Sequence, residues 1–198
     1  MIPPILDTPT PTAKIKRPLP QDGPICLNLG GAGEGFLDGR IPGFLTVDLR
    51  DVDDTDIVSD ISDLSWLENE TVDQIYCSNA LEHFPIPQTL DVLKEWYRVL
   101  KPKGKMFISV PDFDAAVKMY LKFGLNGWIQ YLIWGDQKTP LNYHYINFTF
   151  ATLSGLMIEA GFKDVKRVKE FPFGVKDAST HRDNYLKMPI SLNVEVFK

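Results

Sequence analysis

The sequence of 198 residues contains only two cysteines, Cys26 and Cys77, and three histidines. Both cysteines fall in predicted strands, so we interpret them as small buried residues in a reducing compartment, without a disulfide framework or a metal site. No apolar run approaches the ~18 residues that a membrane-spanning helix needs. The first 20 residues also lack the apolar core of a signal peptide. We therefore expect a cytoplasmic protein that binds neither a membrane nor a metal.

An excess of positive charge is missing as well. Lys and Arg number 21 against 26 Asp and Glu, which gives a net charge of −5. No cluster of Lys and Arg resembles the basic stripe that follows nucleic-acid phosphates. The charge therefore argues against a nucleic-acid partner. It leaves the oligomeric state open.

What the sequence does contain suits one globular domain, with 44% hydrophobic and 12% aromatic residues. Seven prolines fall within residues 1–24. Proline fixes φ and removes a hydrogen-bond donor, so this segment predicts an extended arm outside the core. The predicted domain then spans residues 25–198.

Short apolar runs alternate with helical patterns from residue 25 onward. The predicted strands are 25–29, 44–47, 57–58, 74–77, 105–110, 164–170 and 192–197, and a turn at 101–104 precedes the fifth. The predicted helices are 88–100 and 150–160. Continuous apolar runs of this length are typical of a parallel sheet that is covered on both faces. The alternation predicts a doubly wound α/β fold.

A glycine-rich loop, LGGAGEG at residues 29–35, directly follows the first strand. Glycines let the backbone turn sharply and let a ligand approach without a Cβ in the way. A tight surface turn would use the same residues. Asp48 favours the ligand interpretation, because a carboxylate at the end of the second strand can accept hydrogen bonds from ribose hydroxyls.

NAD and S-adenosylmethionine would both suit such a crevice. The dinucleotide spacing Gly-x-Gly-x-x-Gly does not occur, and only residues 36–43 separate the loop from the second strand. A crossover with a full helix usually needs at least ~10–12 residues, so this helix is about one turn long or missing. Dinucleotides need the N-terminus of that helix for their pyrophosphate, whereas S-adenosylmethionine has no phosphate. The spacing therefore disfavours an NAD(P)-dependent oxidoreductase.

Five segments resemble, in order, the motifs of class I S-adenosylmethionine-dependent methyltransferases, in particular the short type-11-like group. They are ICLNLGGAG, PGFLTVDLR, IVSDISDL, QIYCSNALEHF and EWYRVLKPKGKMFISVPDF. The resemblance covers roughly residues 25–111 and is weaker through 149–198. It implies a Rossmann-like, mostly parallel sheet of seven strands with the last strand antiparallel. It also implies short helices after strands 1 and 2, a helical insertion after strand 5, and S-adenosylhomocysteine as a product.

The resemblance also implies cofactor contacts. Gly30, Gly31 and Gly33 would pass beneath the methionine and ribose of the cofactor. Asp48 would accept hydrogen bonds from the ribose hydroxyls, and Leu49 would pack on the adenine.

The remaining implied contacts come from the first, third and fourth strands. Asp60 would accept from the adenine amine and Ile61 would offer its backbone N–H, although Asp60 is also a good helix cap. Ser78 and Asn79 would border the methionine end. Asn28 stands where the family usually has an acidic residue, which removes a charge from the pocket.

Two histidines are candidate catalytic residues. Methyl transfer is an in-line displacement, so a base is needed only when the acceptor must lose a proton. His83 follows the fourth strand and would either contact the acceptor or cap the helix beside the cofactor. His144 is a candidate base or acceptor contact.

Residues 112–148 predict a helical, aromatic-rich cap over the active site. We expect most of its aromatic side chains to form a small core, with Tyr143 and Tyr145 in the substrate pocket. Asp112, directly after the fifth strand, is a further substrate-binding candidate.

The acceptor class rests on the resemblance alone. Residues 78–81 read SNAL, unlike the Asn-Pro-Pro-Tyr pattern of enzymes that methylate amino groups of DNA bases or glutamine, and a Pro-Cys pair is absent. Relatives of the short group are often associated with surface polysaccharides, which favours O-methylation of a sugar or another small molecule. The alternative from another class is a non-catalytic S-adenosylmethionine-binding partner or scaffold.

Overall fold

The computed structural model describes residues 13–33, 40–174 and 177–198. The described strands are β1 (Lys14–Ile15), β2 (Cys26–Leu29), β3 (Leu45–Asp48), β4 (Ile57–Val58), β5 (Val72–Ser78), β6 (Leu100–Pro111), β7 (Lys163–Val168) and β8 (Ser191–Phe197). The described helices are η1 (Leu81–His83), α1 (Ile86–Val99), α2 (Phe113–Phe123), α3 (Gly127–Trp134), α4 (Phe150–Ala160) and η2 (Ala178–Thr180).

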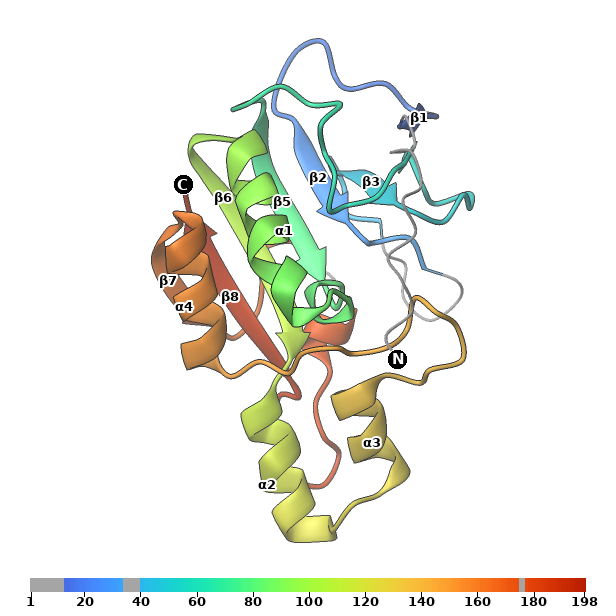
Figure 1. Ribbon diagram of the computed structural model, residues 1–198, viewed down its shortest axis with the longest axis vertical. Coiled ribbons are helices and arrows are strands. Elements are labelled where there is room, and N and C mark those ends of the chain that lie inside the picture. Colours follow the sequence, from blue (N-terminus) through green and yellow to red (C-terminus); the bar gives the residue numbers. More distant parts are fainter. Residues whose placement is uncertain (1–12, 34–39, 175–176) are drawn as a thin grey trace.

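The strands form one sheet in the order β1-β4-β3-β2-β5-β6-β8-β7 (Figure 1). Strands β4, β3, β2, β5 and β6 run parallel to their neighbours in this series, and β8 is antiparallel to both β6 and β7. The predicted α/β sheet, mostly parallel with its last strand antiparallel, is therefore confirmed.

The predicted number of seven strands is wrong, because the described sheet has eight. The additional strand, β1, comes from the proline-rich arm, where Lys14 and Ile15 pair antiparallel with β4. An edge strand offers unpaired backbone groups, and residues 14 and 15 are not proline and can pair with them. The expectation of an arm outside the core is corrected too, since Ala13 and Leu19 pack against the main core. Residues 1–12 of the arm lie outside the described residues.

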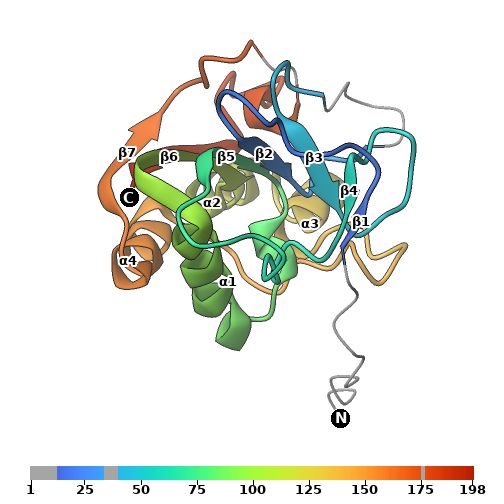
Figure 2. The ribbon, with the colours of Figure 1, turned by 90° about the horizontal axis from the view of Figure 1, so that it is seen from above.

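The two faces of the sheet are covered differently. Side chains alternate along a strand, so Ile75 and Cys77 join the main core while Tyr76 joins a smaller cluster on the opposite face. The main core packs under α1 and α4, which lie on one side of the sheet in Figure 2. The smaller cluster packs under Phe171 and Phe173, from the segment between β7 and η2.

This arrangement departs from the doubly wound pattern. Among the described residues, no α-helix covers the face of Tyr76. The connections after β2 and β3 are the reason, because they are too short to carry a full helix back across the sheet. Residues 40–43 and 49–56 are not helical, and the remainder of the predicted short helix, 36–39, lies outside the described residues.

Two predicted boundaries change. The helix predicted at 88–100 begins at Ile86, with a proline in its first turn. The turn predicted at 101–104 lies inside β6, where Lys103 has φ of 68°. Leu100 pairs with Val72, and the pairing with β5 is irregular beyond that point. The turn residues are therefore an interruption within a strand that begins five residues before the predicted one.

Helices α2 and α3 lie beyond the carboxyl ends of the strands (Figure 1). Their shared core is small and aliphatic, made by Met119, Ile129, Leu132 and Ile190. The expectation that the aromatic residues form most of this core is wrong. Two short helices share only one narrow face, so most aromatic side chains of residues 112–148 are exposed, whereas Phe148 is buried in the main core. Those with exposed side chains are Tyr120, Phe123, Trp128, Tyr131, Trp134, Tyr143 and Tyr145.

Within the described ranges, no helix combines the length and the apolar character needed to cross a membrane.

Candidate functional site

A cavity of about 700 Å³ opens at the carboxyl ends of β2, β3, β4 and β5. This edge is where ligands bind in open α/β sheets. The predicted site residues that line it are Gly30, Asp48, Leu49, Asp60, Ile61, Asn79 and His83. The sequence prediction did not include its other lining residues, Arg50, Val52, Ala80, Phe84, Thr139, Pro140, Leu141 and Asn142.

The loop after β2 is packed so closely that two of its positions require glycine. Gly30 has φ of +71°, and a Cβ there would lie 2.8 Å from the Cβ of Ala80. A Cβ on Gly31 would lie 2.0 Å from Nδ2 of Asn28. Asn28 is 2% exposed, and it lies behind the loop with Gly31 rather than on the cavity wall. Gly33 is also outside the lining, and the end of the predicted loop, 34–35, falls outside the described residues.

Asp48 connects this loop to the end of β3. Asp48 is 4% exposed, and its carboxylate accepts four hydrogen bonds. Oδ1 accepts from the backbone N and Nε of Arg50, at 2.9 Å each. Oδ2 accepts from the backbone N of Ala32 at 3.1 Å and from Arg50 Nη2 at 2.8 Å. Arg50 therefore neutralises a carboxylate that also holds the glycine loop in place.

Asp60 caps a turn and also lies on the cavity wall. Its Oδ1 accepts from the backbone N of Ser62 at 2.8 Å and from the Ser62 hydroxyl at 2.7 Å, so it caps the turn after β4. Asp60 also lines the cavity, next to Ile61. The carbonyl of Ile61 accepts from Trp96 Nε1 at 2.7 Å, which fixes this wall to α1. Leu49, 47% exposed, adds an apolar side chain to the same cavity.

Asn79 turns the chain away from the sheet after β5. It has φ of 51°, a left-handed conformation that asparagine tolerates better than most residues. Its backbone N donates to the carbonyl of Ser109 at 2.8 Å, and its Oδ1 accepts from the Ser78 hydroxyl at 3.3 Å. Asn79 lines the cavity, whereas Ser78 lies outside the lining and contacts Asn79.

Beyond Asn79, helix η1 meets the segment between α3 and α4. The rings of His83 and His144 lie edge to face with centroids 4.9 Å apart. His83 Nδ1 lies 3.1 Å from the carbonyl oxygen of Tyr143. The backbone N of Tyr145 donates to the carbonyl of Glu82 at 2.8 Å. The fold thus brings together two histidines that are far apart in the sequence.

Burial controls the protonation of this cluster. Glu82 is 1% exposed, and desolvation raises the pKa of its carboxyl group to about 8. Burial also lowers the pKa of the His83 imidazole. For His144, burial and then the neighbouring His83 lower the pKa to about 4. Both imidazoles are therefore neutral at pH 7.

Three predicted substrate contacts lie outside the cavity lining. Asp112 is 3% exposed, caps α2 through the backbone N of Asp114, and accepts from Arg167 Nη2 at 2.5 Å. These bonds give Asp112 a structural role, and it does not line the cavity. Tyr143 and Tyr145 are 38% and 51% exposed. Their backbone groups, not their side chains, contact His83 and Glu82 of η1. The side chains of their preceding neighbours, residues 139–142, reach the cavity instead.

Sequence reasoning also missed Glu82 and Arg50. Both stand beside predicted site residues, His83 and Leu49, and that adjacency was the available signal. The burial of Glu82 and the ion pair of Arg50 with Asp48 depend on long-range packing, which a local pattern does not report.

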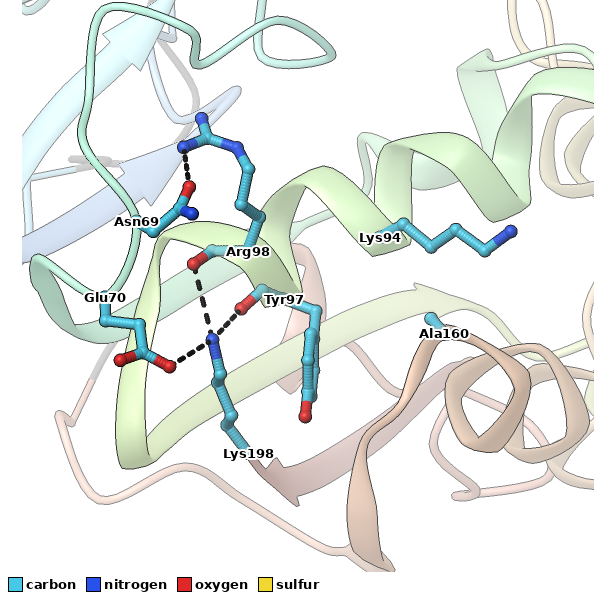
Figure 3. A pocket seen from close by; sticks show the side chains of 7 residues that line it. All are labelled: Asn69, Glu70, Lys94, Tyr97, Arg98, Ala160 and Lys198. Carbon is cyan, nitrogen blue, oxygen red and sulfur yellow. Dashed lines mark hydrogen bonds and ion pairs between the residues drawn. The ribbon is translucent and has the colours of Figure 1, made fainter.

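A second hollow, of about 390 Å³, lies at the C-terminal end of α1 (Figure 3). Lys198 Nζ donates to the carbonyls of Tyr97 and Arg98 at 2.9 and 3.3 Å and pairs with Glu70 at 3.4 Å. Arg98 Nη1 donates to Asn69 Oδ1 at 2.8 Å. A lysine that satisfies the last carbonyls of a helix explains these groups as structural.

Comparison with known proteins agrees with this arrangement. A family model described as a methyltransferase domain matches residues 42–108. No curated protein matches the sequence. A solved S-adenosylmethionine-dependent methyltransferase from Archaeoglobus fulgidus is 14% identical, with 88% of this chain and 86% of that chain covered and a TM-score of 0.55.

Two further solved structures are similar. A possible histamine N-methyltransferase from Thermotoga maritima is 18% identical over 89% of this chain and 83% of that chain, with a TM-score of 0.55. The 1,6-didemethyltoxoflavin-N1-methyltransferase of Burkholderia thailandensis, with bound S-adenosylhomocysteine, is 17% identical over 88% and 71%, with a TM-score of 0.53. At these identities the similarity establishes the fold. Together with the family match over residues 42–108, it shows that this chain has the fold of the S-adenosylmethionine-dependent methyltransferases.

Proposed function

We propose that this protein transfers the methyl group of S-adenosylmethionine to a hydroxyl group of a small molecule, with a sugar as the first candidate. The observation that carries this proposal is the cavity at the carboxyl ends of β2–β5. It gathers Gly30, Asp48 and Leu49 at the ends of β2 and β3, and Asn79 and His83 after β5. The site for the cofactor and the site for its acceptor are thus one continuous space.

The residues present fit the cofactor. Gly30 lines the cavity with bare backbone, and the packing against Ala80 shows that this position excludes a side chain. A ligand can therefore pass directly over the loop. Leu49 offers an exposed apolar surface for a purine ring, and Asp60 lies on the same wall to accept from an amine.

Asp48 would bind the ribose hydroxyls after a change of partner. Its carboxylate is held by Arg50, whose side chain is 45% exposed. The guanidinium can therefore move into solvent while the carboxylate accepts from two hydroxyls and keeps its bond from Ala32 N. A charged acceptor in a buried site gives stronger hydrogen bonds than a neutral one.

Bound S-adenosylmethionine supplies a methyl group on a sulfonium. The acceptor attacks the methyl carbon in line and displaces the sulfur. The chain itself has to orient the two molecules and exclude water. Phe84 and the segment 139–142 line the cavity beyond Asn79, and we propose that they enclose the acceptor. His83 lines the same space, with His144 against its ring, so we place the acceptor next to this pair.

The test is thermal unfolding of the protein with S-adenosylmethionine, S-adenosylhomocysteine, NAD or no ligand. A ligand at about 100 times its dissociation constant stabilises the fold by about 2.7 kcal/mol. For a chain of this size that raises Tm by roughly 5–10 °C. We expect this rise with both adenosyl ligands. A rise with NAD alone would contradict the cofactor assignment.

Turnover is then measured with cofactor that carries a labelled methyl group, on a panel of sugar and other small hydroxyl acceptors, proteins and nucleic acids. We expect label only in the hydroxyl acceptors. Label confined to proteins or nucleic acids would contradict the acceptor class. Cofactor binding without label in any fraction of a cell extract would instead support the non-catalytic alternative.

A further inference from the structure

Glu82, His83 and His144 form a cluster at the edge of the cavity. Glu82 and His83 lie on η1, and His144 comes from the connection between α3 and α4, which runs past the carboxyl ends of the strands (Figure 1). Each residue offers one ligand atom, and these three atoms lie within 4.8 Å of one another. One carboxylate oxygen and two imidazole nitrogens thus converge on a single point.

The hydrogen bonds of the two histidines indicate which ring nitrogen of each would bind a ligand. His83 Nδ1 lies 3.1 Å from the carbonyl oxygen of Tyr143, and His144 Nδ1 lies 3.1 Å from the carbonyl oxygen of Leu132. A carbonyl only accepts, so each Nδ1 carries the proton and each Nε2 keeps its lone pair. Metal-binding histidines are oriented in this way, by donating their other ring N–H to an oxygen.

Glu82 adds a buried carboxyl group that has no hydrogen-bond partner among the described residues. It is 1% exposed, and neither of its oxygens accepts a hydrogen bond of ordinary geometry from the residues that the structure describes. A buried carboxyl without a partner costs free energy, which a bound cation would recover.

No lysine or arginine of the described ranges forms an ion pair with Glu82. Two other charged side chains influence the histidines electrostatically. Arg50 does so at His83, and Asp136 does so at His144. Arg50 is already paired with Asp48, and Asp136 pairs with Lys138. The cluster therefore has metal-ligand atoms but no Lys or Arg paired with them among the described residues.

We propose that Glu82, His83 and His144 bind a divalent first-row transition-metal ion, with Zn²⁺ as the best match. Two neutral imidazoles and one carboxylate suit this class of ion. Bonds of ~2.0–2.2 Å place neighbouring ligand atoms of a tetrahedral site roughly 3.4 Å apart, so small side-chain rotations complete the geometry. Three protein ligands leave one position open.

The use of that open position rests on the proposed function. His83 also lines the cavity, so the ion lies beside the acceptor. An acceptor hydroxyl bound there has a lowered pKa and releases its proton to solvent water. Its oxygen then forms the bond to the methyl carbon as the carbon–sulfur bond breaks, and the electron pair of that bond returns to sulfur.

The test titrates chelator-treated, full-length protein with Co²⁺, follows the visible absorption of the bound ion, and then adds Zn²⁺ in competition. We expect one equivalent of Co²⁺ per chain, displaced by Zn²⁺. Even removal of a residue that only orients a ligand costs about 10–100-fold in metal affinity. Glu82→Gln and His144→Ala should therefore each weaken Co²⁺ binding at least about 10–100-fold.

His181→Ala is the matched control, because His181 is the remaining histidine and lies outside the cluster. Its variant should bind Co²⁺ as the wild type does. Circular dichroism and a cooperative urea unfolding transition show that each variant is folded. No stoichiometric Co²⁺ binding by the wild type, or an equal loss in His181→Ala, would overturn the site.

The metal site and the proposed methyl transfer can be overturned independently of each other. Metal binding without S-adenosylmethionine binding would leave the metal site in place and overturn the proposed function. Loss of methyl transfer on chelation, with cofactor affinity retained, would support the role of the ion in binding the acceptor. Transfer that continues at an unchanged rate after chelation would overturn that role.

Discussion

At the scale of single residues, Asp48 shows that a side chain on the cavity wall can also hold the structure together. The carboxylate accepts from Ala32 and from Arg50 before any ligand is bound. A residue used in both ways keeps its geometry, since its position is fixed by the protein and only Arg50 has to move. Substitution of Asp48 should therefore affect both binding and folding, because Ala32 N and the Arg50 guanidinium lose their acceptor.

Asp48→Ala should lower the affinity for S-adenosylmethionine about 10- to 150-fold, because a hydrogen bond to a charged group contributes roughly 1.5–3 kcal/mol. Isothermal titration calorimetry measures this loss. Asp91→Ala is the control, since the Asp91 side chain is 81% exposed on α1 and far from the cavity lining. Unchanged affinity in a folded Asp48→Ala variant would show that the ribose contact is misassigned.

Gly31→Ala should destabilise the fold, since the new Cβ would lie 2.0 Å from the buried side chain of Asn28. Overpacking of this kind costs about 1–3 kcal/mol. Gly155→Ala is the matched control, because nothing lies within 4 Å of a Cβ there and the position is inside α4. It should stabilise by about 0.5–1 kcal/mol. Urea unfolding of both variants measures the two opposite signs, and an equal effect would refute the packing argument.

At the scale of elements, Asp73 connects the beginnings of three neighbouring strands. On β5, its Oδ2 accepts from the backbone N of Ile25, before β2, at 2.9 Å and from Lys101 Nζ, on β6, at 2.7 Å. Burial by itself would raise the pKa of Asp73, but these two donors together hold the pKa below its ordinary value. The carboxylate therefore stabilises the fold in its ionised form.

The sign of the pH effect follows from this lowered pKa. The contribution is present above the unfolded pKa, near 3.8, and is lost as the pH falls through the folded value. Asp73→Asn should cost about 0.5–1.5 kcal/mol at pH 7 and pH 5. The difference from the wild type should shrink below about pH 3.8. Urea unfolding at pH 7, 5 and 3.5 checks this, and a difference independent of pH would exclude the ionic contribution.

At the scale of the whole molecule, the segment after β7 replaces the helices missing from one face of the sheet. The Tyr76 hydroxyl donates to Oδ2 of Asp177, whose Oδ1 accepts from the backbone N of Ser179 at 2.8 Å. Burial and then the Asp177 carboxylate raise the pKa of Tyr76. Together with Phe171 and Phe173, this buried pair attaches residues far along the chain to the centre of the sheet.

Tyr76→Phe should destabilise the protein by about 1–3 kcal/mol, because it keeps the ring packing and removes the donor to the buried Asp177. The comparison is Tyr185→Phe, in which the side chain is 82% exposed and the expected change is near zero. Urea unfolding measures both. If the two variants were equally stable, the buried hydrogen bond would contribute nothing net.

Much of the fold could be predicted from local patterns. The helix at Phe150–Ala160 and the strand at Ile57–Val58 have the predicted boundaries, and the order of strands and helices follows from the apolar runs. The edge strand at Lys14–Ile15 could not be predicted, because two residues carry no periodic signal. Their pairing depends on β4 being an open edge in the folded sheet.

The candidate site divides in the same way. Glycines at 30 and 31 and acidic residues at strand ends are local signals, so the sequence was enough to predict them. Asp112 was assigned to substrate because it follows a strand, and its partner Arg167 is distant in the chain. The convergence of Glu82, His83 and His144 is also long-range, and it needs the α3–α4 connection to lie against η1.

The sequence by itself determined the sheet, its glycine loop and the cofactor class, because backbone conformation and hydrophobic periodicity are local properties. Tertiary structure alone decided which polar side chains are paired, which are buried without a partner, and which aromatic residues lie in solvent. Those outcomes depend on contacts between residues far apart in the chain. The protonation of Glu82 and its proposed use as a metal ligand are of this second kind, since burial set by distant segments controls both.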